Sequence, residues 1–235
     1  MVLGFIKLFK SLSLSYKNND LRVYIHLLIN ANNYNTHYDG VTITTGQLIT
    51  SYHSIADKLK ISDKAARVAV QHLVDGGYIS CRGYRRKYTI ITITDYAMQS
   101  SGTYNFTKLY RQIQANTWYA DDVTAKTYYY ILLHADSNNI TTTTLSALCD
   151  TLGVTTTRIY TALDNLAADR AVHVDRNRQR IIITIAGAKT KSKATQSTTS
   201  TTPTTTATQS ATYSPTYSPN YSPASPPPDL EDDWY

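Results

Sequence analysis

Two stretches of this chain share one pattern of apolar and polar positions. The first is IADKLKISDKAARVAVQHL, from Ile55 to Leu73, and the second is LCDTLGVTTTRIYTALDNL, from Leu148 to Leu166. They align without a gap, and apolar residues recur in both at the spacing of amphipathic helices separated by a tight turn. The pattern predicts one helix-turn-helix in each stretch. The aligned apolar pairs are Ile55 with Leu148, Leu59 with Leu152, Ile61 with Val154, Ala69 with Ala162, and Leu73 with Leu166.

Matching segments flank the two stretches. A lead-in precedes each one, FIKLFKSL from Phe5 and FTKLYRQI from Phe106, and a basic turn with an Ile/Thr-rich strand follows each one. We interpret the first lead-in as a structural helix and not as a signal peptide, because Lys7 and Lys10 interrupt its apolar run and its counterpart recurs in mid-chain. A repeat of this length predicts a repeated domain.

The same periodicities predict the elements of each repeat, and they predict one apolar face for the first helix of the first repeat. The first repeat is expected to hold helices over residues 20–32, 52–60 and 62–74, capped at Ser51 and Ser62, with a loop over 32–40, a β segment over 41–51 and strands over 78–82 and 88–94. The second repeat is expected to hold helices over residues 123–135, 143–151 and 156–168, with strands over 172–174 and 181–186.

This order of elements predicts an α+β protein with two tandem winged helix-turn-helix domains. The domains are expected over residues 1–98 and 104–188, joined by a short polar link. Residues 189–235 are rich in Thr, Ser, Pro and Tyr and lack apolar periodicity. Such a segment cannot bury enough surface to offset its conformational entropy, so we expect a disordered tail.

Charge is unevenly placed along the chain. The net charge is +6 overall, and it divides into +6 for residues 1–99, +2 for residues 100–190 and −2 for the rest. The first repeat is therefore expected to be the better partner for a polyanion. The two cysteines, Cys81 and Cys149, have no spacing typical of a zinc site and are expected to be buried free thiols. We expect no membrane span, no cofactor and a cytoplasmic location.

The second helix of each helix-turn-helix is the candidate recognition helix for the major groove of DNA. In the first repeat we expect Ala66, Val70 and Leu73 on the inward stripe of this helix. Its outward face carries Lys64, Arg67 and Gln71, which are suited to guanine, phosphate or adenine. The hairpin that follows, which we call the wing, carries Arg82, Arg85, Arg86 and Lys87 and is expected to lie along phosphates. The alternatives are a solvated helix face and an edge hairpin kept soluble by charge.

The second repeat offers fewer cations. Its candidate DNA contacts are Arg158 on the recognition helix and Arg176, Arg178 and Arg180 in the loop of the wing. Because the helix face is otherwise nearly neutral, contact with DNA and contact with a protein both stay open. The acidic and aromatic end of the tail is a candidate site for a protein partner, with a purely solubilising role as the alternative. Its residues are Asp229, Leu230, Glu231, Asp232, Asp233, Trp234 and Tyr235.

The first repeat resembles a known family in the segments VYIHLLINAN, GVTITTGQLITSYHSIADKL, AARVAVQHL and KYTIITITDY. They are similar to the N-terminal winged helix of phage replisome-organiser and DnaD-type primosome proteins. The second repeat keeps a similar lead-in but lacks GQLITS, and it has Tyr160 where the first has Arg67. The resemblance implies double-stranded DNA binding during replication initiation in a phage or mobile element, within the host cell cytoplasm. The helical second domain of DnaD proteins is not visible, so activities that depend on it are not carried over.

Other function classes remain open at this stage. A winged helix also serves transcriptional regulators, and the second repeat with the tail would suit an interaction scaffold, with replisome proteins as candidate partners of the tail and a homodimer as one assembly. An enzyme is not expected, because the six histidines are scattered and no phosphate-binding glycine loop is present. None of these histidines is expected to form a ligand pair with a carboxylate.

Overall fold

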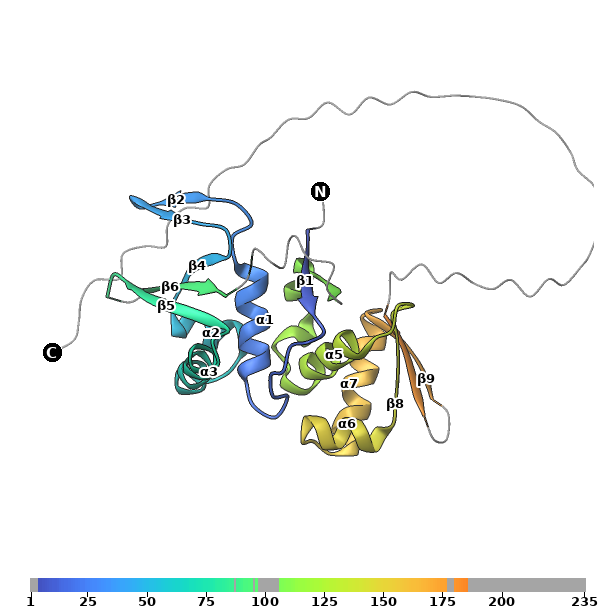
Figure 1. Cartoon of the computed structure of the whole chain (residues 1–235). Coiled ribbons are helices and arrows are strands. Elements are labelled where there is room, and N and C mark those ends of the chain that lie inside the picture. The colour runs from blue at the N-terminus through green and yellow to red at the C-terminus, as the bar shows by residue number, and fades with distance from the viewer. Residues whose placement is uncertain (1–3, 87, 95, 97–105, 177–179, 186–235) are drawn as a thin grey trace, which may run out of the picture. The chain divides into compact units, whose positions relative to one another are not determined.

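The computed structural model describes residues 4–86, 88–94, 96, 106–176 and 180–185 (Figure 1). These residues belong to one compact unit that spans residues 1–191, and they form a mixed α+β fold. The tail from residue 192 makes up the second unit. The expectations for the tail, including its partner-binding end from Asp229 to Tyr235, lie outside the described residues.

The first repeat runs from β1 to β6. Its elements are β1 (Phe5–Phe9), α1 (Asp20–Asn30), β2 (Thr36–Tyr38), β3 (Val41–Ile43), β4 (Gln47–Thr50), α2 (Tyr52–Leu59), α3 (Asp63–Asp75), β5 (Ile79–Tyr84) and β6 (Tyr88–Ile93). Strands β4, β6 and β5 form an antiparallel sheet in that order.

The second repeat has a similar order of elements, but it adds two 3-10 turns before its first helix and has no counterpart of the β2–β3 hairpin among the described residues. Its elements are β7 (Phe106–Tyr110), the 3-10 turns η1 (Arg111–Ala115) and η2 (Thr117–Ala120), α5 (Asp122–His134), β8 (Ile140–Thr143), α6 (Leu145–Leu152), α7 (Thr156–Ala168), β9 (Val172–Arg176) and β10 (Ile181–Ile185). Strands β8, β10 and β9 form an antiparallel sheet, again with the last strand in the middle. Strand β8 therefore takes the place of β4, although the second repeat lacks GQLITS.

The repeated sequence pattern corresponds to a repeated core. The residues at the two ends of each helix-turn-helix stretch are all buried. They are Ile55 with its aligned partner Leu148, and Leu73 with its aligned partner Leu166. The C-cap residue is Lys60 in α2 and Gly153 in α6, both in the left-handed conformation with φ of 52° and 66°. Glycine adopts that conformation without strain, which explains the residue in the second turn.

Local capping signals position the helices. The Ser51 hydroxyl accepts a hydrogen bond from the Ser54 amide, and the Ser62 hydroxyl accepts one from the Ala65 amide, both at 3.1 Å. Each bond satisfies an amide that the first turn of a helix leaves unpaired, so both predicted N-caps are confirmed. In the second repeat Thr144 caps α6 in the same way, whereas Thr155 makes no such bond at the start of α7.

The predicted N-terminal helix is wrong, because the lead-in is strand β1. It pairs antiparallel with the second lead-in, β7, so that Lys7 lies opposite Lys108 and Phe5 opposite Tyr110. Side chains alternate between the two faces of a strand, and Ile6 and Leu8 are buried on one of them. The strand partner lies about a hundred residues away in the chain, so no local pattern could reveal it.

Three other expectations need correction. Residues 32–40 are not simply a loop, because β2 and β3 form a hairpin whose turn residues Asp39 and Gly40 have φ of 50° and 75°. An Asp-Gly turn of this kind is a strong hairpin signal. Cys81 is exposed and Cys149 is only half-buried, although both are free thiols as expected. Helix α1 is buried all round and not on one face only.

The second buried side of α1 faces the other repeat. Arg22 is 1% exposed, and its guanidinium donates to the carbonyls of Leu59 and Ala120, each at 2.9 Å, and to Asp122 at 3.2 Å. It thus ties the end of α2 to the start of α5. On the same side, His26 lies 2.9 Å from the hydroxyl of Tyr119.

The contacts between the repeats are reciprocal. Lys10, in the first lead-in, donates to the carbonyl of Ala135 at the end of α5, and Arg111, at the equivalent place in the second, donates to Ala31 at the end of α1. Tyr16 packs against Tyr130 of α5, just as Tyr119 packs against His26 of α1. The two repeats therefore contact each other through equivalent residues, as the two subunits of a symmetric homodimer do.

Among the described residues, no helix is long and apolar enough to cross a bilayer.

Candidate nucleic-acid interface

The recognition helix of the first repeat, α3, separates its two faces clearly. Ala66, Val70 and Leu73 are buried, as predicted, and Ala69 joins them. Lys64, Arg67 and Gln71 are exposed on the outer face. The helix therefore presents two cations and one amide to solvent, which is the arrangement that groove contact requires.

Two of these side chains are held by neighbours. The guanidinium carbon of Arg67 lies 4.5 Å from the centre of the Tyr52 ring, at the start of α2. Stacking of this kind restrains the planar group while its N–H donors remain at the surface. Gln71 donates to Asp75 on the next turn at 2.8 Å, so its amide must exchange that bond before it can pair with a base.

The wing is the β5–β6 hairpin. Arg82 and Arg86 are exposed, and neither forms an ion pair with a carboxylate of the described residues. Arg85 lies in the left-handed region with φ of 52°, next to the Tyr84 ring, and pairs with Asp39. Lys87 lies outside the described residues.

Asp39 is the residue of this surface that sequence reasoning missed. It belongs to the turn between β2 and β3, and besides pairing with Arg85 it accepts a hydrogen bond from the Tyr84 hydroxyl at 3.2 Å. The hairpin therefore supports the wing and neutralises one of its cations. The Asp-Gly pair could have indicated the turn, but not its contact with the wing.

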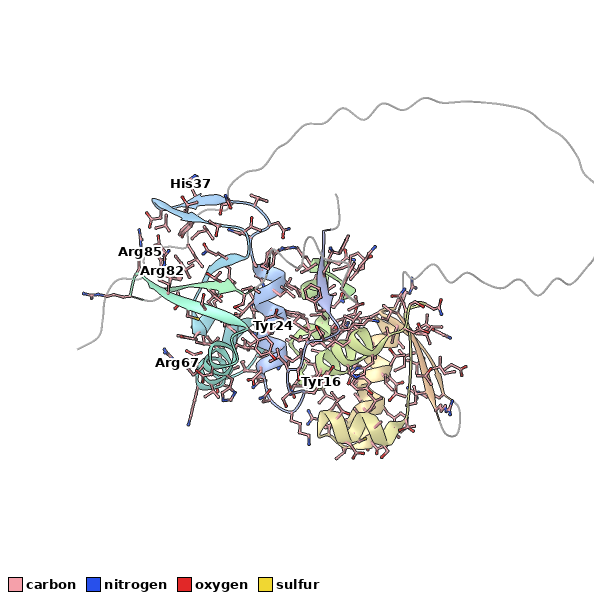
Figure 2. All side chains as sticks on the ribbon, viewed as in Figure 1. Tyr16, Tyr24, His37, Arg67, Arg82 and Arg85 are labelled. Atoms are coloured by element: carbon pink, nitrogen blue, oxygen red, sulfur yellow. The ribbon has the colours of Figure 1, made fainter. Side chains whose placement is uncertain are left out.

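The recognition helix and the wing are neighbours. Helix α3 contacts β5, and in Figure 2 the labelled Arg67, Arg82 and Arg85 lie on the same side of the drawing. We call the exposed Lys64, Arg67, Arg82 and Arg86 the cationic surface. None of these four cations forms an ion pair with a carboxylate of the described residues.

The corresponding surface of the second repeat is different in charge. Arg158 and Arg180 are exposed, and Arg178 lies outside the described residues. Arg176 pairs with Asp164 and lies 5.1 Å from the Tyr160 ring, both on α7. Tyr160 and Asp164 stand where α3 has Arg67 and Gln71, so here the wing is bound to its own helix.

Possible metal ligands do not gather in the part of the chain that the structure describes. It contains no group of three or more His, Cys, Asp or Glu side chains that could hold a metal ion. Two histidines do approach carboxylates, contrary to expectation. His53 lies 3.4 Å from Asp63 and His72 lies 3.2 Å from Asp20, but each pair lacks a third ligand.

Comparison with known proteins finds a distant structural likeness. No protein-family model matches the chain, and no curated protein matches it. Among solved structures, the DIP2311 protein of Corynebacterium diphtheriae is similar over 70% of this chain, with 10% sequence identity and a TM-score of 0.22. The match covers 36% of that protein, which is about a third of its length.

Proposed function

We propose that the chain is a non-enzymatic, double-stranded DNA-binding protein that contacts DNA through the cationic surface of its first repeat. The order of elements supports a winged helix in each repeat: a helix, a strand, a helix-turn-helix and a hairpin, with the last strand in the middle of the sheet. In that fold the second helix of the helix-turn-helix enters the major groove and the hairpin lies against the backbone. One observation carries the proposal. Within the described residues, no carboxylate forms an ion pair with Lys64, Arg67, Arg82 or Arg86.

We further propose a role as a replication initiation or replisome organiser protein of a phage or mobile element, acting in the host cytoplasm. This part rests on the resemblance of the first repeat to DnaD-type winged helices. A transcriptional regulator would use the same surface. A footprint over the replication origin of the element supports initiation, and a footprint confined to a promoter supports regulation.

The test compares matched charge removals in the two repeats. Arg82→Gln with Arg86→Gln should weaken binding to a fluorescent duplex by about tenfold and lower the slope of log affinity against log salt by about 2, because two phosphate contacts are lost. Arg158→Gln with Arg180→Gln removes the same charge from the second repeat and should cost about twofold at most. Equal losses in the two double variants would contradict the assignment to the first repeat.

The helix face of α7, which is nearly neutral apart from Arg158, favours a second candidate, a scaffold that binds proteins through its winged helices. A scaffold predicts duplex affinity that is weak and independent of salt. A slope near zero for the unaltered protein would therefore replace the DNA-binding proposal with this one.

A further inference from the structure

The two-stranded ribbon formed by β1 and β7 has an outer face of unusual composition. Alternate residues of each strand face outward, away from the buried Ile6, Leu8, Thr107 and Leu109. They place an aromatic ring, a lysine and a second aromatic ring in succession on both strands. The outward residues are Phe5, Lys7 and Phe9 on β1, and Phe106, Lys108 and Tyr110 on β7.

The rings and lysines of this face are in contact. The Lys7 ammonium lies 5.0 Å from the centre of the Phe106 ring, and the Lys108 ammonium lies 4.8 Å from the centre of the Phe5 ring. Phe5 and Tyr110 meet edge to face, with their centres 6.3 Å apart. These contacts connect the two strands. They join the alternating rings and lysines into one patch, which we call the ring–lysine face.

The patch is open to solvent in part. Phe5 is 44% exposed and Tyr110 is 39% exposed, and Lys108 is exposed as well. A phenylalanine with nearly half of its surface in water contributes little to the core, which the inward residues already fill. An exposed group of aromatic side chains on a folded domain is more typical of a binding surface than of packing.

The chemistry of the face indicates what it would bind. Exposed rings offer flat surfaces on which unpaired bases can stack, and neighbouring lysines attract the phosphates between those bases. Strands β1 and β7 contain two lysines and no Asp or Glu, so nothing within the ribbon repels a polyanion. Paired bases inside a duplex are already stacked on one another, so a duplex would engage only the lysines.

We propose that the ring–lysine face is a binding site for single-stranded nucleic acid. Bases stack on Phe5 and Tyr110, and Lys7 and Lys108 hold the backbone. The face is built by both repeats, because one strand comes from each, and it shares no residue with the cationic surface.

The experiment measures the binding of a fluorescent oligothymidylate of about 16 nucleotides, which forms no duplex, to the full chain by anisotropy. Phe5→Leu with Tyr110→Leu keeps apolar cover on the ribbon but removes the rings. We expect this double variant to lose affinity for the oligothymidylate by about 25-fold, at about fivefold per stacked base, and to bind the duplex as before.

The matched control removes two exposed aromatics elsewhere. Tyr34 and Tyr38, next to and within the β2–β3 hairpin, are 65% and 54% exposed, and Tyr34→Leu with Tyr38→Leu should leave oligothymidylate binding unchanged. Lys108→Gln is a second test that removes no apolar contact of the core, and it should weaken oligothymidylate binding and its salt dependence together. Thermal unfolding followed by circular dichroism reports whether each variant keeps its fold.

Several results would overturn the proposal. They are a failure of the unaltered chain to bind the oligothymidylate at low salt, an equal loss in the Tyr34 and Tyr38 control, and unchanged binding in folded Lys108→Gln. Binding of anionic phospholipid vesicles without binding of the oligothymidylate would identify a membrane-surface site instead. Because the duplex is measured in parallel, failure of this proposal is distinguishable from failure of duplex binding by the cationic surface.

Discussion

Helices α3 and α7 occupy equivalent places in the two repeats, but they present different chemistry to solvent. At the positions where α3 exposes Arg67 and Gln71, α7 exposes Tyr160 and Asp164. Asp164 pairs with Arg176 of the second wing, whereas Arg82 and Arg86 of the first wing have no carboxylate partner among the described residues. The internal packing is equivalent, but the surfaces differ. The first leaves four cations without a carboxylate partner among the described residues, whereas the second pairs Arg176 with its own helix and leaves Arg158 and Arg180 exposed.

This difference shows which positions carry fold and which carry function. The buried positions are equivalent because each repeat must enclose the same core. The exposed positions are free of that requirement, so they can diverge without loss of the fold. Under the proposed function, the first repeat contacts DNA, and the second supports it or contacts another partner.

The largest expected effect comes from breaking the junction that holds the two repeats together. Arg22→Met should lower the free energy of unfolding by about 3–5 kcal/mol, because it leaves the buried carbonyls of Leu59 and Ala120 without their donor. The control Lys60→Met removes an exposed ion pair with Asp57 and should cost about 1 kcal/mol or less. Urea denaturation measures both, and equal midpoints would show that Arg22 does not secure the junction.

A fall in pH should weaken the same junction between the two repeats. Burial, with the nearby charges of Lys58 and Arg22, lowers the pKa of His26 from 6.5 to about 4. Between those values the unfolded chain binds a proton that the folded chain does not, so stability falls as the pH falls through this window, by up to about 3 kcal/mol. In the equivalent contact of the other repeat, Tyr130 packs against Tyr16.

Thermal unfolding across pH 4 to 6.5 tests this expectation against a variant. His26→Gln should show a flatter dependence of the melting temperature on pH, because it removes the titrating group. Identical slopes for the two proteins would assign the acid sensitivity to other residues.

A smaller effect on stability is expected from the N-cap residues of α3 and α7, and it should differ between the two helices. Ser62→Ala should destabilise the protein by about 1 kcal/mol, because the Ala65 amide loses its acceptor. Thr155→Ala, at the equivalent position, should cost about half as much or less, since Thr155 makes no capping bond. Chemical denaturation of the two variants gives the comparison directly, and a larger loss for Thr155→Ala would reverse it.

The smallest expected effect is a gain in affinity for duplex DNA. Tyr160→Arg with Asp164→Gln gives α7 the side chains of α3 and releases Arg176, so duplex affinity should rise by about threefold and the salt slope by about 1. Ala167→Arg with Asp169→Asn makes the same charge change at the C-terminal end of α7 and should have no more than about half that effect. A gain of equal size in both would point to net charge and not to the recognition face.

The sequence pattern was sufficient for much of this protein. Helix α7 matches its expected range, both predicted serine caps form, and the inward stripe of α3 is buried as expected. These features depend on contacts a few residues apart, and such contacts leave a periodic or local trace in the chain. The outward placement of the arginines follows from the same periodicity.

Only the tertiary structure decided the features that join distant segments. The pairing of β1 with β7, the burial of Arg22 between the repeats and the pairing of Asp39 with Arg85 each connect residues that lie far apart in the chain. A lead-in of alternating apolar residues becomes a strand because another strand is present to accept its backbone hydrogen bonds. The sequence by itself determined which residues face the core of each repeat, and the folded chain determined which partner each remaining face received.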